Sequence, residues 1–174
     1  MPLPSARRVA LLLAPAAGPA ALWAASDTAR PWILLNTTPS EPRGLYVRSN
    51  TPPAVGRLIA FRAPPAAFPY ADERLGYLRH EQMLKAVAAG PGDTVCAARG
   101  HLSINGRPRA TIAAVDERGT ALPHWNACRT LSADELFVFS DRVPNSFDSR
   151  YFGPVARTAK VAVYTPLTDL WRTP

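Results

Sequence analysis

Side chains that bind metals are scarce in this sequence of 174 residues, which has two cysteines and three histidines. The cysteines do not form a C-x-x-C pair, and metal-ligand spacing is missing from the histidines, which are His80, His101 and His124. The residues therefore argue against a zinc site. A collagen-like chain is excluded as well, because the 10 glycines follow no G-X-Y period.

Lysine is almost absent from the chain. Of 20 basic residues only Lys85 and Lys160 are lysines, and the formal net charge is +7. A general preference for arginine explains this bias, yet it draws attention to the two lysines, because a buried lysine can lose its proton and an arginine cannot. The arginines are scattered, and no basic run is interleaved with aromatic residues, so we expect no nucleic-acid partner.

Long helices and internal repeats are also missing from the pattern. The 19 prolines are spread along the chain, which argues against a helical bundle. Hydrophobic residues make up 47% of the chain and charged residues 19%, so the chain can bury a core and is not a disordered tail.

Short apolar runs bounded by turn residues predict strands at 45–47, 57–61, 94–95, 102–104, 135–140 and 161–164. An Asn-Gly pair after the fourth of these runs is typical of a hairpin turn. We expect a helix over residues 72–81 with Asp72 as its N-cap. The predicted fold class is therefore mainly β, with one or two short helices.

The longest apolar stretch lies near the start of the chain. Arg7 and Arg8 precede residues 9–26, which carry no charge and end in a small-x-small pattern. We interpret residues 1–26 as a signal peptide or signal anchor, with a buried core helix as the alternative. Residues 27–174 then form one exported domain, either free in the periplasm or anchored to the inner membrane. No second long apolar run follows, so we expect at most one span.

Export favours a disulfide between the two cysteines. In an oxidising compartment Cys96 and Cys128 are expected to pair. Such a bond would stabilise the fold by roughly 3–4 kcal/mol in the chain-entropy model. The alternative is two unpaired, buried thiols.

Three polar segments carry candidate chemistry. Ser40 lies between two prolines in a turn-forming segment, Lys85 is the one charge in an apolar run over 82–89, and residues 141–153 are rich in polar side chains. Taken singly, these are a turn, an edge lysine and a polar loop. Taken together, they suggest acyl transfer by a serine whose base is a lysine.

A lysine must be neutral to act as a base. At its reference pKa of ~10.4 a lysine is neutral in about one of 2500 molecules at pH 7. Burial among apolar side chains lowers the pKa of a lysine by roughly 3–5 units. The neighbours of Lys85, which are Met83, Leu84, Ala86 and Val87, provide such surroundings.

The lysine and polar segments resemble two sequence boxes of the type I signal peptidase family. LKAVAAGPGDTV at 84–95 is similar to the family's lysine box, and SDRVPNSFDSRYFGPV at 140–155 is similar to its final box. The serine box differs from the S-M-x-P-T of general leader peptidases. Its form here, N-T-T-x-S-x-P-x-G-L-Y at 36–46, resembles the TraF-type conjugative-transfer peptidases. An arginine that follows the family's lysine is replaced by Ala86.

This resemblance implies a signal-peptidase-like β fold and a set of residue roles. Ser40 is the expected nucleophile and Lys85 the expected general base. The Ser40 backbone N–H and the Thr38 hydroxyl are expected to bind the oxyanion, and the Ser146 hydroxyl to orient the lysine. Three charged residues are expected to support the site: Asp141, Asp148 and Arg150.

The resemblance also implies a serine endopeptidase that needs no cofactor. Its substrate would be a pilin precursor at the inner membrane, released as a linear or a cyclic product. A general type I signal peptidase, which removes signal peptides from many secreted proteins, is the alternative. An exported binding module without activity is a further reading, and the presence of Ser40 and Lys85 argues against it.

Overall fold

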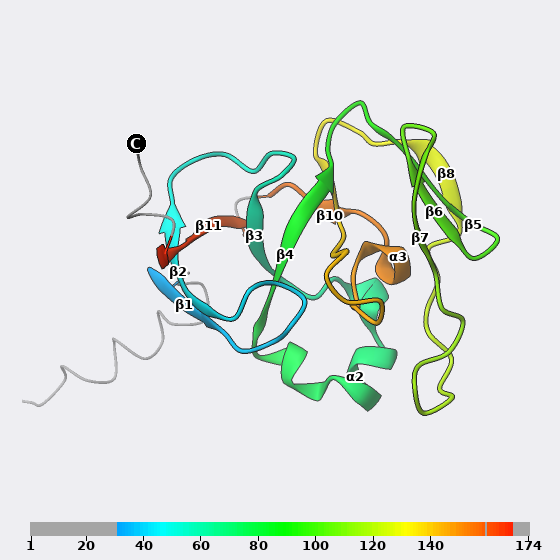
Figure 1. The fold of residues 1–174 in the computed structure, drawn as a ribbon, viewed down its shortest axis with the longest axis horizontal. Coiled ribbons are helices and arrows are strands. Elements are labelled where there is room, and N and C mark those ends of the chain that lie inside the picture. The colour runs from blue at the N-terminus through cyan, green and yellow to red at the C-terminus, as the bar shows by residue number, and fades with distance from the viewer. Residues whose placement is uncertain (1–30, 159, 169–174) are drawn as a thin grey trace, which may run out of the picture. The chain divides into compact units, whose positions relative to one another are not determined.

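The computed structural model describes residues 31–158 and 160–168, so the expected signal segment over 1–26 lies outside the described residues. Over the described ranges, no helix is long and apolar enough to cross a membrane. The described chain is mainly β, which confirms the predicted fold class (Figure 1).

The larger sheet has seven strands in the order β1-β2-β11-β3-β4-β9-β10, and its neighbours are antiparallel. Its central strands are apolar and mostly buried, whereas β1 is an exposed edge. The bounds are β1 Ile33–Asn36, β2 Gly44–Ser49, β3 Leu58–Arg62, β4 Gln82–Ala89, β9 Glu135–Val138, β10 Val155–Ala156 and β11 Ala162–Pro166.

A second, four-stranded sheet has the order β7-β6-β5-β8. The predicted hairpin turn joins β6 to β7, and both Asn105 and Gly106 have positive φ, which these two residue types tolerate best. Cys96 and Cys128 lie directly opposite each other on β5 and β8, and the expected disulfide joins them. The bounds are β5 Thr94–Ala98, β6 His101–Ile104, β7 Arg107–Thr111 and β8 Ala127–Thr130.

The helices differ from the prediction. Helix α2 spans Tyr70–Arg74 with Pro69 at its N-cap position, so the prediction that Asp72 caps the helix was wrong. The backbone leaves the helical region at Leu75, with φ −134° and ψ 44°, and only a short 3-10 turn follows at Gly76–Arg79. A second helix, α3 at Ser149–Phe152, forms where the sequence indicated a polar loop.

Helix α3 forms because Asp148 caps it. The side chain of Asp148 accepts a hydrogen bond from the backbone N–H of Arg150 at 3.2 Å. The ring of Phe152 packs edge-on against Phe61 of β3, with 6.4 Å between the ring centroids. Tertiary packing thus fixes a helix too short to be stable alone.

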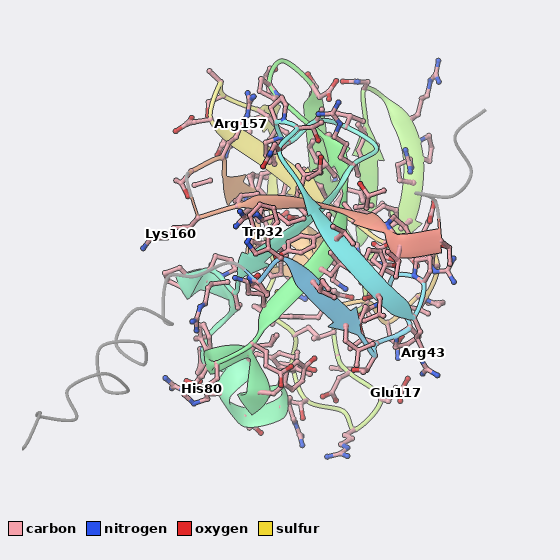
Figure 2. All side chains as sticks on the ribbon, turned by 90° about the vertical axis from the view of Figure 1, so that its left-hand side faces the viewer. Trp32, Arg43, His80, Glu117, Arg157 and Lys160 are labelled. Carbon is pink, nitrogen blue, oxygen red and sulfur yellow. A yellow bond between two sulfur atoms is a disulfide. The ribbon has the colours of Figure 1, made fainter. Side chains whose placement is uncertain are left out.

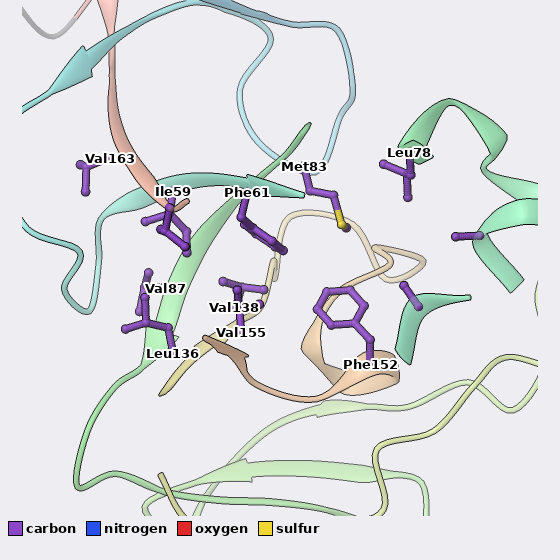
Figure 3. Packing of buried hydrophobic residues seen from close by; sticks show 13 residues of the cluster. Ile59, Phe61, Leu78, Met83, Val87, Leu136, Val138, Phe152, Val155 and Val163 are labelled. Atoms are coloured by element: carbon purple, nitrogen blue, oxygen red, sulfur yellow. The ribbon is translucent and has the colours of Figure 1, made fainter. Parts of the chain in front are cut away.

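Two apolar cores lie on opposite faces of β9. Leu136 and Val138 belong to a core that β3, β4 and the helical segments enclose, as Figure 3 shows. Phe137 and Phe139 face a second core under the four-stranded sheet. Because side chains alternate along a strand, a continuous apolar run is what a strand covered on both faces requires.

Candidate active site

The loop that carries Ser40 joins β1 to β2, and Asn36 at the end of β1 organises it. Asn36 Nδ2 lies 3.0 Å from the carbonyl oxygens of Thr38, Glu41 and Pro42, and Asn36 Oδ1 accepts the Thr38 N–H at 3.2 Å. Asn36 and Ser40 are both 6% exposed. We did not predict this role for Asn36, although it is the first residue of the serine segment quoted above.

Two side chains fasten this loop to the body of the larger sheet. The hydroxyl of Ser140, just after β9, donates to the carbonyl oxygen of Ser40. The carboxylate oxygen Oε1 of Glu41 accepts the backbone N–H of Ala86 on β4 at 2.9 Å. Ser40 is therefore held beside the strand segment that contains Lys85, 45 residues away in sequence.

Lys85 is buried in the face of β4 that meets the first core. Met83 and Val87 lie on the same face of the strand, and Ile59 is its partner across the pair with β3. Of the sequence neighbours expected to surround Lys85, Met83 and Val87 lie on its face of the strand, whereas Leu84 faces the other side of the sheet. Lys85 is 6% exposed.

Among the described residues, the lysine ammonium makes one hydrogen bond, to another predicted site residue. Lys85 Nζ donates to Ser146 Oγ at 2.9 Å. Burial lowers the pKa of Lys85 from its ordinary value of 10.5 to about 8; the charges of Asp148 and Glu41 oppose this effect, and Arg150 adds to it. A pKa of about 8 leaves about one lysine in ten neutral at pH 7.

Asp148 and Arg150 form a buried ion pair that positions Ser146. Arg150 Nε lies 2.8 Å from Asp148 Oδ1 and Arg150 Nη2 lies 2.9 Å from Asp148 Oδ2. Arg150 Nη2 also donates to the carbonyl oxygen of Ser146 at 2.7 Å. The two charged residues are 0% and 2% exposed, so each neutralises a charge that burial would otherwise penalise.

Thr38 lies close to the expected nucleophile, but its proton is engaged. Thr38 Oγ1 is 3.5 Å from Ser40 Oγ and donates to Asn36 Oδ1 at 2.8 Å. A hydroxyl has one proton to give. Thr38 must therefore rotate its hydroxyl away from Asn36 before it can donate to an oxyanion.

Asp141 stands apart from the other predicted site residues. Its side chain is 75% exposed, and it contacts Arg109 at 3.9 Å in an exposed ion pair. Such a pair stabilises little, because water screens it. The structure thus brings together Ser40, Thr38, Lys85, Ser146 and the Asp148–Arg150 pair, and leaves Asp141 at the surface.

The assembled groups suit acyl transfer. A serine hydroxyl, a buried lysine and further hydroxyls supply a nucleophile, a base and donors for an oxyanion. Within residues 31–158 and 160–168, no group of three or more histidine, cysteine or acidic side chains is arranged to hold a metal ion.

Comparison with known proteins points to one family. The family described as "Signal peptidase, peptidase S26" matches residues 9–165 of the chain. Plasmid transfer protein TraF of Escherichia coli is 35% identical over 144 residues, which cover 76% of this chain and 81% of that protein. Conjugal transfer protein TraF of Agrobacterium tumefaciens (strain 15955) is 35% identical over 145 residues, which cover 76% of this chain and 80% of that protein.

A solved structure is also similar. A signal peptidase I from Enterococcus faecalis V583 aligns with a TM-score of 0.41 and 26% identity, over 67% of this chain and 100% of that chain.

Proposed function

The chain belongs to the S26 signal peptidase family, with TraF proteins among its relatives, and we propose that it processes a conjugative pilin precursor through a Ser40/Lys85 dyad. The observation that carries this proposal is the burial of Lys85 beside the tethered Ser40 loop, with its Nζ held by Ser146. An edge lysine with a purely structural role would extend its ammonium into water.

In the first step neutral Lys85 removes the proton of Ser40 Oγ, which attacks the carbonyl carbon of the scissile peptide bond. Among the described residues, Ser146 rather than Ser40 accepts the hydrogen bond from Lys85 Nζ, so substrate binding must complete the approach of base to nucleophile. The Ser146 hydroxyl then fixes one N–H of the neutral amine and leaves its lone pair for Ser40.

The negative oxygen of the tetrahedral intermediate is stabilised by the Ser40 N–H and by Thr38 Oγ1 after its rotation away from Asn36. Lys85 returns its proton to the leaving amine, and the acyl group stays on Ser40. Water, deprotonated by Lys85, then attacks the ester and releases a linear product. If the amino terminus of the substrate attacks in place of water, the product is cyclic.

Exposed apolar side chains near Ser40 support action at a membrane. Ile33 and Leu35 share the outer face of β1, and Leu45 is the partner of Leu35 on β2. Their exposed fractions are 60%, 64% and 45%, and Trp32, labelled in Figure 2, is 63% exposed. An apolar surface that adjoins the loop of Ser40 fits a substrate presented from the inner membrane.

Mass spectrometry of a candidate pilin tests this proposal. The precursor is co-expressed with the full chain or with its Ser40→Ala variant, and the pilin mass is measured. We expect a shortened pilin with the unaltered chain and the full-length precursor with Ser40→Ala. A mass one water lower than that of the linear product indicates cyclisation.

Unchanged processing by Ser40→Ala contradicts the proposed nucleophile. Equal cleavage of several unrelated secretory precursors would instead favour the general signal peptidase. The serine box at 36–46, which resembles the TraF type, is the reason for placing the pilin first. The names of the TraF relatives, which refer to plasmid and conjugal transfer, support a role in conjugation.

A further inference from the structure

Glu41 is a buried ionisable residue that the mechanism above does not use. It follows Ser40 directly and is 5% exposed. Its backbone carbonyl accepts from Asn36 Nδ2 at 3.0 Å, and its carboxylate accepts the Ala86 N–H at 2.9 Å. Glu41 therefore belongs to the Ser40 loop through its backbone and to β4 through its side chain.

The carboxylate of Glu41 binds β4 at the point where the neighbouring strand β9 has ended. The N–H of Val87 points toward β3, to Arg57 O, so that of Ala86 points to the other side. On that side the backbone N–H of Phe139, the residue after β9, donates to the carbonyl oxygen of Ala86 at 3.1 Å. Glu41 supplies the acceptor for the neighbouring N–H, one residue from Lys85.

The charge of Glu41 is less compensated than those around it. Three charges act on Lys85: that of Glu41 in the serine loop, and those of Asp148 and Arg150 in the segment that contains α3. Strand β3, which pairs with β4, places the apolar Ile59 opposite Lys85. Asp148 is neutralised by its bidentate contact with Arg150. Glu41 makes no direct ion pair among the described residues.

Two further charges act on Glu41. Arg142 attracts its negative charge and Asp141 repels it, both from the exposed segment after β9. Burial is the largest effect and raises the pKa of Glu41, while the Ala86 N–H and the charge of Lys85 lower it. The carboxylate and the ammonium thus stabilise each other's charged forms.

We infer that Glu41 is a positioning residue of the dyad: its carboxylate fastens the Ser40 loop to β4, and its negative charge favours the protonated, inactive form of Lys85. This inference rests on the proposed function. It follows that activity rises at a higher pH than it would if the residue beside Ser40 were neutral.

The variant Glu41→Gln separates the two roles of this side chain. Glutamine keeps an oxygen that accepts the Ala86 N–H, so the loop remains attached, but the negative charge is lost. Glu41→Ala removes both the attachment and the charge. Glu73→Gln is the matched control, because Glu73 lies on α2, is 65% exposed, and is not among the charges that act on Lys85.

The protonation of Lys85 can be followed without any assay of activity. With only two lysines, protein labelled with [13Cε]lysine gives two side-chain signals, and Lys85→Met assigns them. Lys160, labelled in Figure 2, is exposed and is not among the charges that act on Lys85, so it is the internal reference. We expect the titration midpoint of Lys85 to fall by about one pH unit in Glu41→Gln and to stay unchanged in Glu73→Gln.

Pilin processing as a function of pH gives the second measurement. The acid limb of kcat/KM should move to lower pH in Glu41→Gln by the same amount as the midpoint. Glu41→Ala should also lose kcat at every pH, by about tenfold or more, because the Ser40 loop is released. Circular dichroism checks that each variant is folded.

An unchanged Lys85 midpoint in Glu41→Gln overturns the inference, whether or not the protein processes the pilin. If the midpoint shifts in Glu41→Gln but the unaltered chain cleaves no pilin, the control of Lys85 by Glu41 is supported and the proposed function is overturned. A shift of the midpoint and of the acid limb together supports both.

Discussion

Replacement of Lys85 by methionine tests the proposed base and the cost of burying it. Methionine has a similar length, and Met83 and Val87 already line the same face of β4. The variant removes the ammonium and its hydrogen bond to Ser146, so no group remains to take the proton of Ser40. General-base catalysis contributes typically 10²–10⁴-fold, and we expect pilin processing to fall at least that far.

The same variant should be more stable than the unaltered protein at pH 7. Burial lowers the pKa of Lys85 from 10.5 to about 8, which corresponds to about 3 kcal/mol of lost stability while the lysine is protonated. Loss of the hydrogen bond to Ser146 costs about 1 kcal/mol. The net expectation for Lys85→Met is a gain of about 2 kcal/mol in the free energy of unfolding, measured in urea.

The sign of the pH dependence follows from the lowered pKa. Between pH 8 and about 10.4 the unfolded chain binds the lysine proton and the folded protein does not. Stability of the unaltered protein therefore rises through this interval, and the advantage of Lys85→Met disappears above it. Processing should rise in parallel as pH passes through about 8, because the neutral amine is the active form.

Lys85→Arg is the companion variant, and Lys160→Arg is its matched control. Arginine keeps the positive charge and a donor for Ser146, but its guanidinium stays protonated and cannot act as a base. We expect Lys85→Arg to be inactive and Lys160→Arg to process the pilin normally. Retained turnover in Lys85→Arg, or in Lys85→Met, would refute the reasoning about the dyad. A Lys85→Met variant that fails to fold by circular dichroism would refute the expected gain in stability.

Other variants test single contacts. Thr38→Val should lower kcat by about 10²-fold if its hydroxyl binds the oxyanion, whereas an unchanged kcat would exclude that role. Asp148→Asn should destabilise the protein by about 3–5 kcal/mol in urea, because it leaves a buried arginine unpaired; Asp141→Asn, at an exposed position, should leave the unfolding midpoint unchanged. Non-reducing peptide mapping should show Cys96 linked to Cys128, and free thiols in periplasmic protein would contradict the bond.

Local sequence pattern predicted the parts of the fold that depend on near neighbours. Apolar runs between turns gave most of the strands, and the Asn105-Gly106 pair gave the β6–β7 turn. Strand β1 was missed because it is short and exposed at the sheet edge. Helix α3 was missed because it is only four residues long and lies in a segment rich in polar side chains; its cap and the packing of Phe152 on Phe61 make it a helix.

The same contrast between local pattern and long-range contacts holds for the site. The motifs indicated Ser40, Lys85 and Ser146, and the structure brings the elements that carry them together. The contacts that hold them there join distant residues: Ser140 donates to Ser40 over 100 positions, and Glu41 accepts from Ala86 over 45. No pattern within a single segment predicts such pairs, which is why the part of Glu41 was not foreseen.

Two cations, Lys85 and Arg150, are buried in the part of the chain that the structure describes, and they show why the few lysines matter. Arg150 lies in the same polar cluster as Lys85 and is less exposed, yet it serves a different purpose. Its planar fork makes two bonds to Asp148 and a third to Ser146, a fixed arrangement that requires a permanent charge and several donors. Lys85 has one bond, to the hydroxyl of that same Ser146, and apolar neighbours that favour release of its proton. In a chain whose basic residues are almost all arginine, the proposed base is a lysine, because arginine stays protonated and cannot take the proton of Ser40.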